Sequence, residues 1–202
     1  MHNEIVDYWQ ELLFVMQAMP LDTIVKAAEM LLACYQRGNT VFTLGNGGSA
    51  ATASHFACDL AKGTKAFPAF RVISLSDNVS LLTAWANDTS YERVFAEQLA
   101  SLVRSDDVVV AMSVSGNSPN VLAAASVAQQ SGAITIALTD QSGGKLSQLA
   151  DLAICVPSQA IEQVENAHLI ITHSLCALLR QRLCTSSIII EQAEPSVTSA
   201  FS

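Results

Sequence analysis

Residues 40–50 read Thr40-Val41-Phe42-Thr43-Leu44-Gly45-Asn46-Gly47-Gly48-Ser49-Ala50, and this stretch decides the fold. A short β-branched run passes through a glycine loop directly into a segment with helical spacing. Apolar runs of this length occur at residues 40–44, 71–75, 107–113, 134–139 and 152–156. Helical segments lie between and after them, at residues 49–61, 94–103, 117–131 and 162–183. Apolar strands that alternate with helices predict an α/β fold, in which a parallel sheet is covered by helices on both faces.

Two more helical segments precede this pattern, at residues 3–18 and 21–36, and Pro20 separates them. With right-handed crossovers, the five strands give a doubly wound sandwich. We therefore expect one domain over residues 1–184, in which the helices within residues 3–37 serve assembly. Residues 185–202 are expected to form a tail that is poorly ordered or docked on a neighbouring chain.

The composition of the chain excludes several classes of protein. The 202 residues carry 10 Lys+Arg and 18 Asp+Glu, which gives a net charge of −8, and half of them are hydrophobic. An acidic chain without a basic cluster is not expected to bind nucleic acid or an anionic membrane. The first ten residues lack the basic region of a signal peptide, and no apolar stretch is long enough to span a bilayer. The high hydrophobic fraction then requires either an exceptionally buried core or a large subunit interface.

The five cysteines indicate the compartment. They are odd in number, scattered and without CxxC spacing, which is typical of reduced thiols in a cytoplasmic protein. They are Cys34, Cys58, Cys155, Cys176 and Cys184.

Two loops at strand ends are candidates for ligand binding, since a doubly wound sheet binds ligands at the carboxyl ends of its strands. The loop at residues 45–50 combines glycines with a helix N-terminus, whose free N–H groups attract anions. No Lys follows, so it is not a P-loop, and a simple tight turn is the alternative. The loop at residues 113–120, Ser-Val-Ser-Gly-Asn-Ser-Pro-Asn, offers three hydroxyls at a second helix N-terminus. Helix capping is the alternative there, but two such loops in one sheet favour a small phosphorylated metabolite.

Two helices carry side chains for metal binding or proton transfer. His55 and Asp59 are four residues apart and share a helix face, a spacing that suits two ligands of one metal ion or a hydrogen-bonded pair. Glu165, His168 and His173 lie on the last helix, where burial without partners is costly. We assign His168 to the core as a hydrogen-bonded residue.

Together, GNGGSA at residues 45–50 and SVSGNSPNV at residues 113–121 resemble the SIS (sugar isomerase) domain family. Within it the chain is most similar to the phosphoheptose isomerases, over about residues 12–183. The further motifs that carry this resemblance are Ala86-Asn87-Asp88, Tyr91-Glu92-Arg93-Val94-Phe95, Leu138-Thr139 with Gly143-Gly144-Lys145-Leu146, and His55-Phe56-Ala57.

This resemblance implies an aldose–ketose isomerase that converts sedoheptulose 7-phosphate to D-glycero-D-manno-heptose 7-phosphate through an enediol. It also implies a homotetramer and a divalent metal, zinc, held by His55, Asp59, Glu165 and His173. Asp59 and His173, with Glu165, occupy the catalytic positions. Asp59 stands where the family has Glu, and Glu165 stands where it has Gln. The expected substrate contacts are Asn46, Gly47, Gly48, Ser49, Asp59, Asn87, Asp88, Ser113, Val114, Ser115, Ser118 and Glu165.

Helix geometry adds an expectation about assembly. Glu165 and His173 are eight residues apart, about 12 Å along an ideal helix, so they cannot both bind one zinc ion in a straight helix. Either the first turn is bent or the site mixes chains, and the resemblance implies the second, because sites at subunit interfaces are usual in the proteins that this chain resembles. A metal cluster that includes Asp59 and His173 would then close only where chains meet.

Two other functions stay open. The departures at Asp59 and Glu165 favour a non-catalytic SIS-fold adaptor, similar to the protein that associates with the DnaA replication initiator, whereas His55 and His173 favour an enzyme. The third possibility is an isomerase for another sugar phosphate, such as a hexose phosphate.

Overall fold

A computed structural model of the chain describes residues 1–65 and 68–193, with side chains up to residue 184. Its strands are β1 (Thr40–Gly45), β2 (Arg71–Ser74), β3 (Val108–Met112), β4 (Ile134–Thr139) and β5 (Leu152–Cys155). Its α-helices are α1 (His2–Gln17), α2 (Leu21–Arg37), α3 (Gly48–Cys58), α4 (Val79–Asp88), α5 (Val94–Ala100), α6 (Pro119–Gln130), α7 (Leu146–Leu149) and α8 (Ile161–Ala193). A π-helical turn, η1 (Asp59–Gly63), continues α3, and a 3-10 turn, η2 (Tyr91–Arg93), precedes α5.

The five strands form one parallel sheet in the order β2-β1-β3-β4-β5, which confirms the predicted fold class. From β1 the chain moves outward to β2, then returns to the other side of β1 to form β3. The gap between the carboxyl ends of β1 and β3 is therefore the topological switch point, where ligands of such sheets bind. The loop at residues 45–50, called the glycine loop below, follows β1, and the loop at residues 113–120, called the serine loop, follows β3, so both lie at this point.

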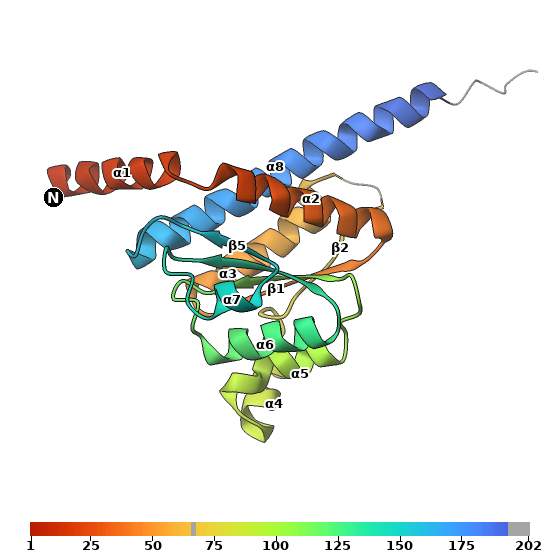
Figure 1. Cartoon of the computed structure of the whole chain (residues 1–202), viewed down its shortest axis with the longest axis horizontal. Helices are drawn as coiled ribbons and strands as arrows, with labels where there is room; N and C mark the ends of the chain where they lie inside the picture. Colours follow the sequence, from red (N-terminus) through yellow and green to blue (C-terminus); the bar gives the residue numbers. More distant parts are fainter. Residues whose placement is uncertain (66–67, 194–202) are drawn as a thin grey trace, which may run out of the picture.

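Helices cover both faces of the sheet (Figure 1). α2, α3 and α8 pack on one face, and α4, α5 and α6 lie on the other. β3 is buried along its whole length because its alternating side chains enter two cores. Val110 packs with Leu31 and Phe56 in one core, while Val109 packs with Phe95 in the other.

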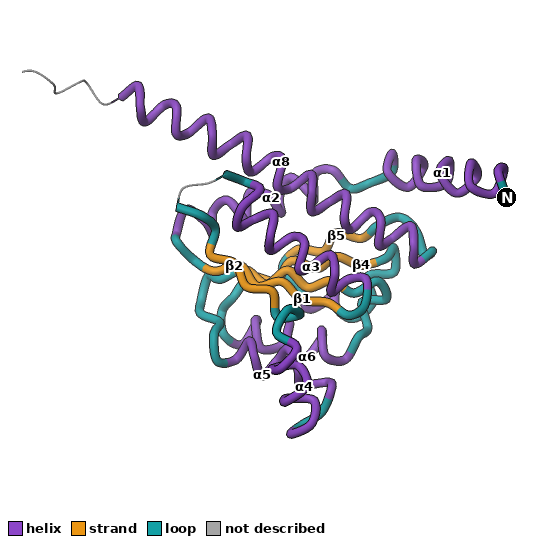
Figure 2. The backbone as a smooth tube through the Cα atoms, turned by 180° about the vertical axis from the view of Figure 1, so that it is seen from behind, coloured by secondary structure: helices purple, strands orange, loops and turns teal. Residues whose placement is uncertain are grey.

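Two helices extend from the body of the molecule, α1 at one side and the C-terminal half of α8 at the other (Figure 2). α1 keeps large apolar side chains in solvent, including Trp9 at 65% exposure and Phe14 at 69%. No helix within the described ranges has the length and apolarity needed to cross a membrane.

The last helix differs from its prediction. We expected it to end at residue 183 and a tail to begin at 185, but α8 continues to Ala193. The reason is that no Gly or Pro occurs between Leu183 and Ala193, and the first helix breaker is Pro195. The rest of the predicted tail, residues 194–202, lies outside the described residues.

Candidate active site

The glycine loop turns sharply between β1 and α3. Gly47 has φ +54°, a left-handed conformation that only glycine adopts at little cost. A Cβ on Gly45 would lie 2.8 Å from backbone atoms of Ser49, so the strand end and the first turn of α3 are in close contact. Because α3 has no side-chain cap, its first N–H groups stay available at the carboxyl edge of the sheet.

The serine loop is braced by a second glycine loop. Gly116 has φ +61°, and a Cβ there would lie 2.2 Å from the carbonyl oxygen of Gly143. A Cβ on Gly144 would lie 2.4 Å from the carbonyl oxygen of Ser115. The N–H of Leu146 donates to the carbonyl oxygen of Gly116 at 2.9 Å. This backbone-to-backbone packing is a physical reason for the paired glycines of the quoted Gly143-Gly144 motif.

The hydroxyls of the serine loop gather at the N-terminus of α6. Ser113 Oγ and Ser118 Oγ are 3.0 Å apart, and Ser115 Oγ accepts the N–H of Asn117 at 3.2 Å. Ser118 holds the N-cap position of α6 but makes no side-chain cap hydrogen bond. The capping alternative is therefore wrong for Ser118, whose hydroxyl pairs with Ser113 instead.

A cavity of about 370 Å³ opens between the two loops, a size in the range of small-molecule sites. Seven of the predicted substrate contacts line it: Asn46, Ser49, Ser113, Val114, Ser115, Ser118 and Glu165. Within the described part of the chain, its lining contains neither lysine nor arginine. Any phosphate there would be held by hydroxyls, backbone N–H groups and the positive ends of two helices.

Sequence reasoning missed several residues of this site. The carboxamides of Asn46 and Asn120 form two mutual hydrogen bonds of 2.9 Å, and Tyr91 donates its hydroxyl to Asn46 Oδ1 at 3.0 Å. Asp140 and Gln159, which follow β4 and β5, also line the cavity. Asn120 lies inside the quoted serine motif, and Asp140 and Gln159 follow strand ends, so all three positions carried a usable signal.

Asn87 and Asp88 lie apart from this cavity. They end α4, are exposed, and bond to each other, with Asn87 Nδ2 donating to Asp88 Oδ1 at 2.9 Å. The structure does not bring them to the cavity lining.

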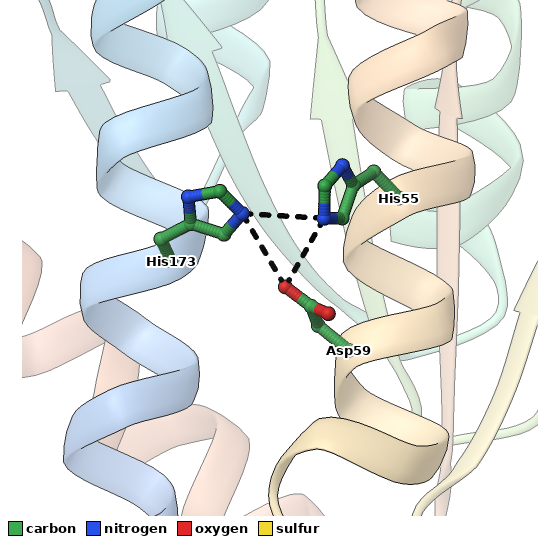
Figure 3. A group of neighbouring side chains, drawn as sticks. All are labelled: His55, Asp59 and His173. Atoms are coloured by element: carbon green, nitrogen blue, oxygen red, sulfur yellow. Dashed lines mark hydrogen bonds and ion pairs between the residues drawn. The ribbon is translucent and has the colours of Figure 1, made fainter.

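Three predicted metal ligands converge within one chain (Figure 3). His55 Nε2 and His173 Nε2 are 3.2 Å apart. Asp59 Oδ2 lies 3.5 Å from His55 Nε2 and 3.6 Å from His173 Nε2. The two imidazole rings meet edge to face at 71°, so that both Nε2 atoms and the carboxylate point to one place.

These separations fit a tetrahedral metal ion. Nitrogen and oxygen ligands about 2.0–2.2 Å from zinc lie about 3.3 Å from one another in a tetrahedron. Two imidazole nitrogens at 3.2 Å also need a proton or a cation between them, because two bare acceptors repel. The residues present therefore suit a divalent cation held by two nitrogens and one oxygen.

Glu165 lies at a different level of the same helix pair. Its carboxylate contacts Gly48, where a Cβ would lie 2.3 Å from Oε1, and the structure does not bring it to the metal cluster. α3 and α8 pack against each other, with Gly48 opposite Glu165 at the first level and His55 opposite His173 at the second. The levels are about 12 Å apart along α8. The expectation that chains must meet to close the cluster is therefore wrong, because α3 supplies the partners of His173 from the same chain.

His168 is a core residue, as predicted. It is 1% exposed, and its Nε2 lies 3.3 Å from the carbonyl oxygen of Thr139. Burial lowers its pKa from 6.5 to about 4, so the ring is neutral at physiological pH. Its Nδ1 has no hydrogen-bond partner among the described residues.

Comparisons with known proteins agree with this geometry. The family model of the SIS domain matches residues 6–140, more than half of the chain. The chain is 38% identical to the phosphoheptose isomerase of Trichlorobacter lovleyi over 79% of this chain and 82% of that protein. It is 36% identical to that of Citrifermentans bemidjiense over 86% of this chain and 91% of that protein.

A solved structure has the same fold. The phosphoheptose isomerase of Neisseria gonorrhoeae superposes with a TM-score of 0.84 at 30% identity, covering 89% of this chain and 98% of that one. The chain therefore belongs to the SIS domain family, among the phosphoheptose isomerases.

Proposed function

We propose that the protein isomerises sedoheptulose 7-phosphate to D-glycero-D-manno-heptose 7-phosphate by proton transfer through an enediol. The observation that carries this proposal is that α3 and α8 contact each other at two levels, about 12 Å apart along α8. A cavity lined by the hydroxyls of the serine loop lies at the first level, and the cluster of His55, Asp59 and His173 lies at the second. The 7-phosphate lies at one end of the substrate and the reacting carbons 1 and 2 lie at the other, so a long sugar suits two separated levels.

The cavity binds the phosphate in this proposal. Ser113, Ser115 and Ser118 donate hydroxyls, and Ser49 with the first N–H groups of α3 completes the cradle. Asn46 is held in place by Asn120 and Tyr91, which orients its carboxamide toward a sugar hydroxyl. Glu165 lines the cavity and accepts a hydrogen bond from another hydroxyl.

Asp59 and His173 carry the proton transfers. The Asp59 carboxylate, 26% exposed, removes the proton next to the carbonyl. His173, 49% exposed and 3.6 Å from that carboxylate, passes a proton to and from the carbonyl and hydroxyl oxygens. This assignment favours Asp59 over Glu165 as the base, since only Asp59 lies beside His173.

We further propose that His55, Asp59 and His173 hold zinc. Bound there, the cation would take the place of the proton that His173 Nε2 carries in the metal-free site, and it would supply a Lewis acid for the carbonyl oxygen of the substrate. Metal analysis of purified protein should give about one zinc per chain. His55→Ala should lose the metal, whereas His2→Ala, at an exposed position on α1, should keep it; equal metal content in both variants would overturn the assignment.

The proposal places the enzyme in the cytoplasm as a homo-oligomer, a tetramer by family resemblance. All five cysteines are free thiols, which fits a reducing compartment. The apolar side chains of α1 that stay in solvent fit a subunit interface.

Turnover of sedoheptulose 7-phosphate, followed by NMR, tests the proposed function. The protein should convert this substrate, while unphosphorylated sedoheptulose and the three-carbon dihydroxyacetone phosphate should react at least about 100-fold more slowly in kcat/KM. Ser113→Ala/Ser118→Ala should raise KM. Preference for fructose 6-phosphate would assign another sugar, and binding to a DnaA initiator without any turnover would assign the adaptor.

A further inference from the structure

A second cavity lies at the opposite edge of the sheet, at the amino ends of β1, β2 and β3. It measures about 320 Å³, and three arginines line it: Arg37, Arg71 and Arg104. The fold brings them together from distant parts of the chain. Arg37 ends α2, Arg71 begins β2 beside Thr40, and Arg104 lies in the turn before β3. β1 separates the two edges by about 17 Å, at about 3.3 Å per residue.

This concentration of charge is unusual for the chain. The protein has six arginines and a net charge of −8, yet half of its arginines line one cavity. Within the described residues, none of the three forms an ion pair, and the side chains of Arg71 and Arg104 make no hydrogen bond. Arg37 Nη2 reaches only the carbonyl oxygen of Asp106, at 3.4 Å.

The acidic residue of the cavity is already engaged. Asp107 Oδ1 accepts the N–H of Thr40 at 2.8 Å and Asn39 Nδ2 at 3.2 Å. Asp107 Oδ2 accepts the N–H of Arg104 at 2.8 Å. Asp107, 3% exposed, therefore fixes the backbone on which Arg104 and β1 sit. Three arginines therefore line one space without an ion-pair partner among the described residues, and positive charges gathered in this way repel one another unless an anion lies between them.

The cavity also has an apolar side. Ile73 is 40% exposed and Leu102 is 45% exposed, and both line it together with the buried ring of Phe42. Guanidinium groups match phosphate oxygens in pairs and also stack on planar rings. We propose that this cavity binds a small phosphate-bearing molecule with a planar or apolar body, of the class of nucleoside diphosphates. This arginine cavity differs in chemistry from the substrate cavity, whose donors are neutral.

Calorimetric titration of the full chain with ADP and with inorganic pyrophosphate tests the proposal. Both should bind, ADP more tightly because of its planar body. Arg71→Gln and Arg104→Gln should each weaken ADP binding about tenfold or more, the effect of losing one charge-assisted hydrogen bond. Lys26→Gln, which removes one exposed charge from α2, should change the affinity less than twofold. Thermal unfolding should match wild type for all three variants, because these side chains are exposed.

Other outcomes overturn the proposal. One such outcome is that ADP does not bind at millimolar concentration. Another is that ADP binds with the same affinity to wild type, Arg71→Gln and Arg104→Gln. Loss of ADP binding in Ser113→Ala/Ser118→Ala would place ADP in the substrate cavity instead. Binding of a single-stranded oligonucleotide, without binding of ADP, would assign the arginines to nucleic acid.

Discussion

At the residue scale, the site depends on two close contacts between side chains or backbone of α3 and side chains of α8. His55 and His173 face each other through Nε2 atoms 3.2 Å apart, and Asp59 closes the triangle. At the other level, Gly48 lets the Glu165 carboxylate lie where any side chain would be. Both contacts join α3 to α8, so a small change on one helix displaces the functional side chains of the other.

Gly48→Ala should therefore act on substrate binding more than on stability. The new Cβ would lie 2.3 Å from Glu165 Oε1, and the end of a flexible side chain can move away. We expect KM to rise about tenfold, with the free energy of unfolding changed by less than about 1 kcal/mol. Steady-state kinetics and urea unfolding measure both quantities. Glu165→Ala should give a similar KM, and a Gly48→Ala protein with wild-type KM would contradict this placement of Glu165.

His168 should make the fold sensitive to acid. Its folded pKa of about 4 lies below the unfolded value of 6.5, so the unfolded state binds more protons between these values. Its contribution is complete above pH 6.5 and is lost as the pH falls toward 4, on the order of 3 kcal/mol in total. Urea unfolding at pH 7 and pH 5 measures the loss. His168→Leu should show a smaller loss over this range, and an equal loss in both proteins would contradict the assignment.

At the element scale, the carboxyl edge of the sheet places the site. β1 and β3 end side by side, and the helices that follow them, α3 and α6, direct their N-termini at one cavity. At Asp59, α3 widens into the π-helical turn η1, in which the N–H of Thr64 bonds the carbonyl oxygen of Asp59 at 3.0 Å. Such turns are frequent at functional sites, and this one begins at Asp59.

Substitutions at two glycines with similar φ angles distinguish the cost of backbone strain from the cost of close packing. Gly38 has φ +71° and open space where a Cβ would lie, whereas Gly116 has φ +61° and a Cβ there would lie 2.2 Å from the Gly143 carbonyl oxygen. Gly38→Ala should cost about 1 kcal/mol of unfolding free energy, the penalty of a left-handed alanine. Gly116→Ala should cost about 2 kcal/mol more, because the backbone itself must move. Urea unfolding measures both, and equal costs would contradict the bracing of the serine loop.

The sequence predicted the strands and helices better than the contacts between them. Strand β4 was predicted at its observed bounds because apolar β-branched runs are local signals. The helix α4 was missed, since its side chains are partly exposed and carry no buried stripe. The meeting of His55 with His173 was predicted only through the family resemblance, because 118 residues separate them and only the packing of α3 on α8 joins them.

At the scale of the whole molecule, α1 keeps an exposed apolar surface that could form a subunit interface. Ile5, Trp9 and Leu13 recur every fourth residue along α1, and each is more than half exposed. The composition left open a buried core or a subunit interface, and the structure has both a two-sided core and this uncovered helix. A stripe of this kind resembles half of a protein core and favours an obligate interface.

Charges placed on this stripe should weaken the proposed oligomer. Trp9→Glu/Leu13→Glu should shift the mass measured by light scattering to a smaller species, because burying two carboxylates in an apolar interface is unfavourable. Gln10→Glu/Gln17→Glu adds the same charge at exposed polar positions of α1 and should keep the wild-type mass. Equal masses for the two double variants would remove α1 from the interface.

The central claim is that Asp59 and His173 of one chain act together in the isomerisation, and a double-mutant cycle tests it most directly. The measurement is kcat for sedoheptulose 7-phosphate in wild type, Asp59→Asn, His173→Ala and the combined variant. We predict that each single change lowers kcat about 10²- to 10⁴-fold, and that the combined variant is no slower than the worse single one. Single variants with wild-type kcat, or losses that multiply in the combined variant, would contradict the account.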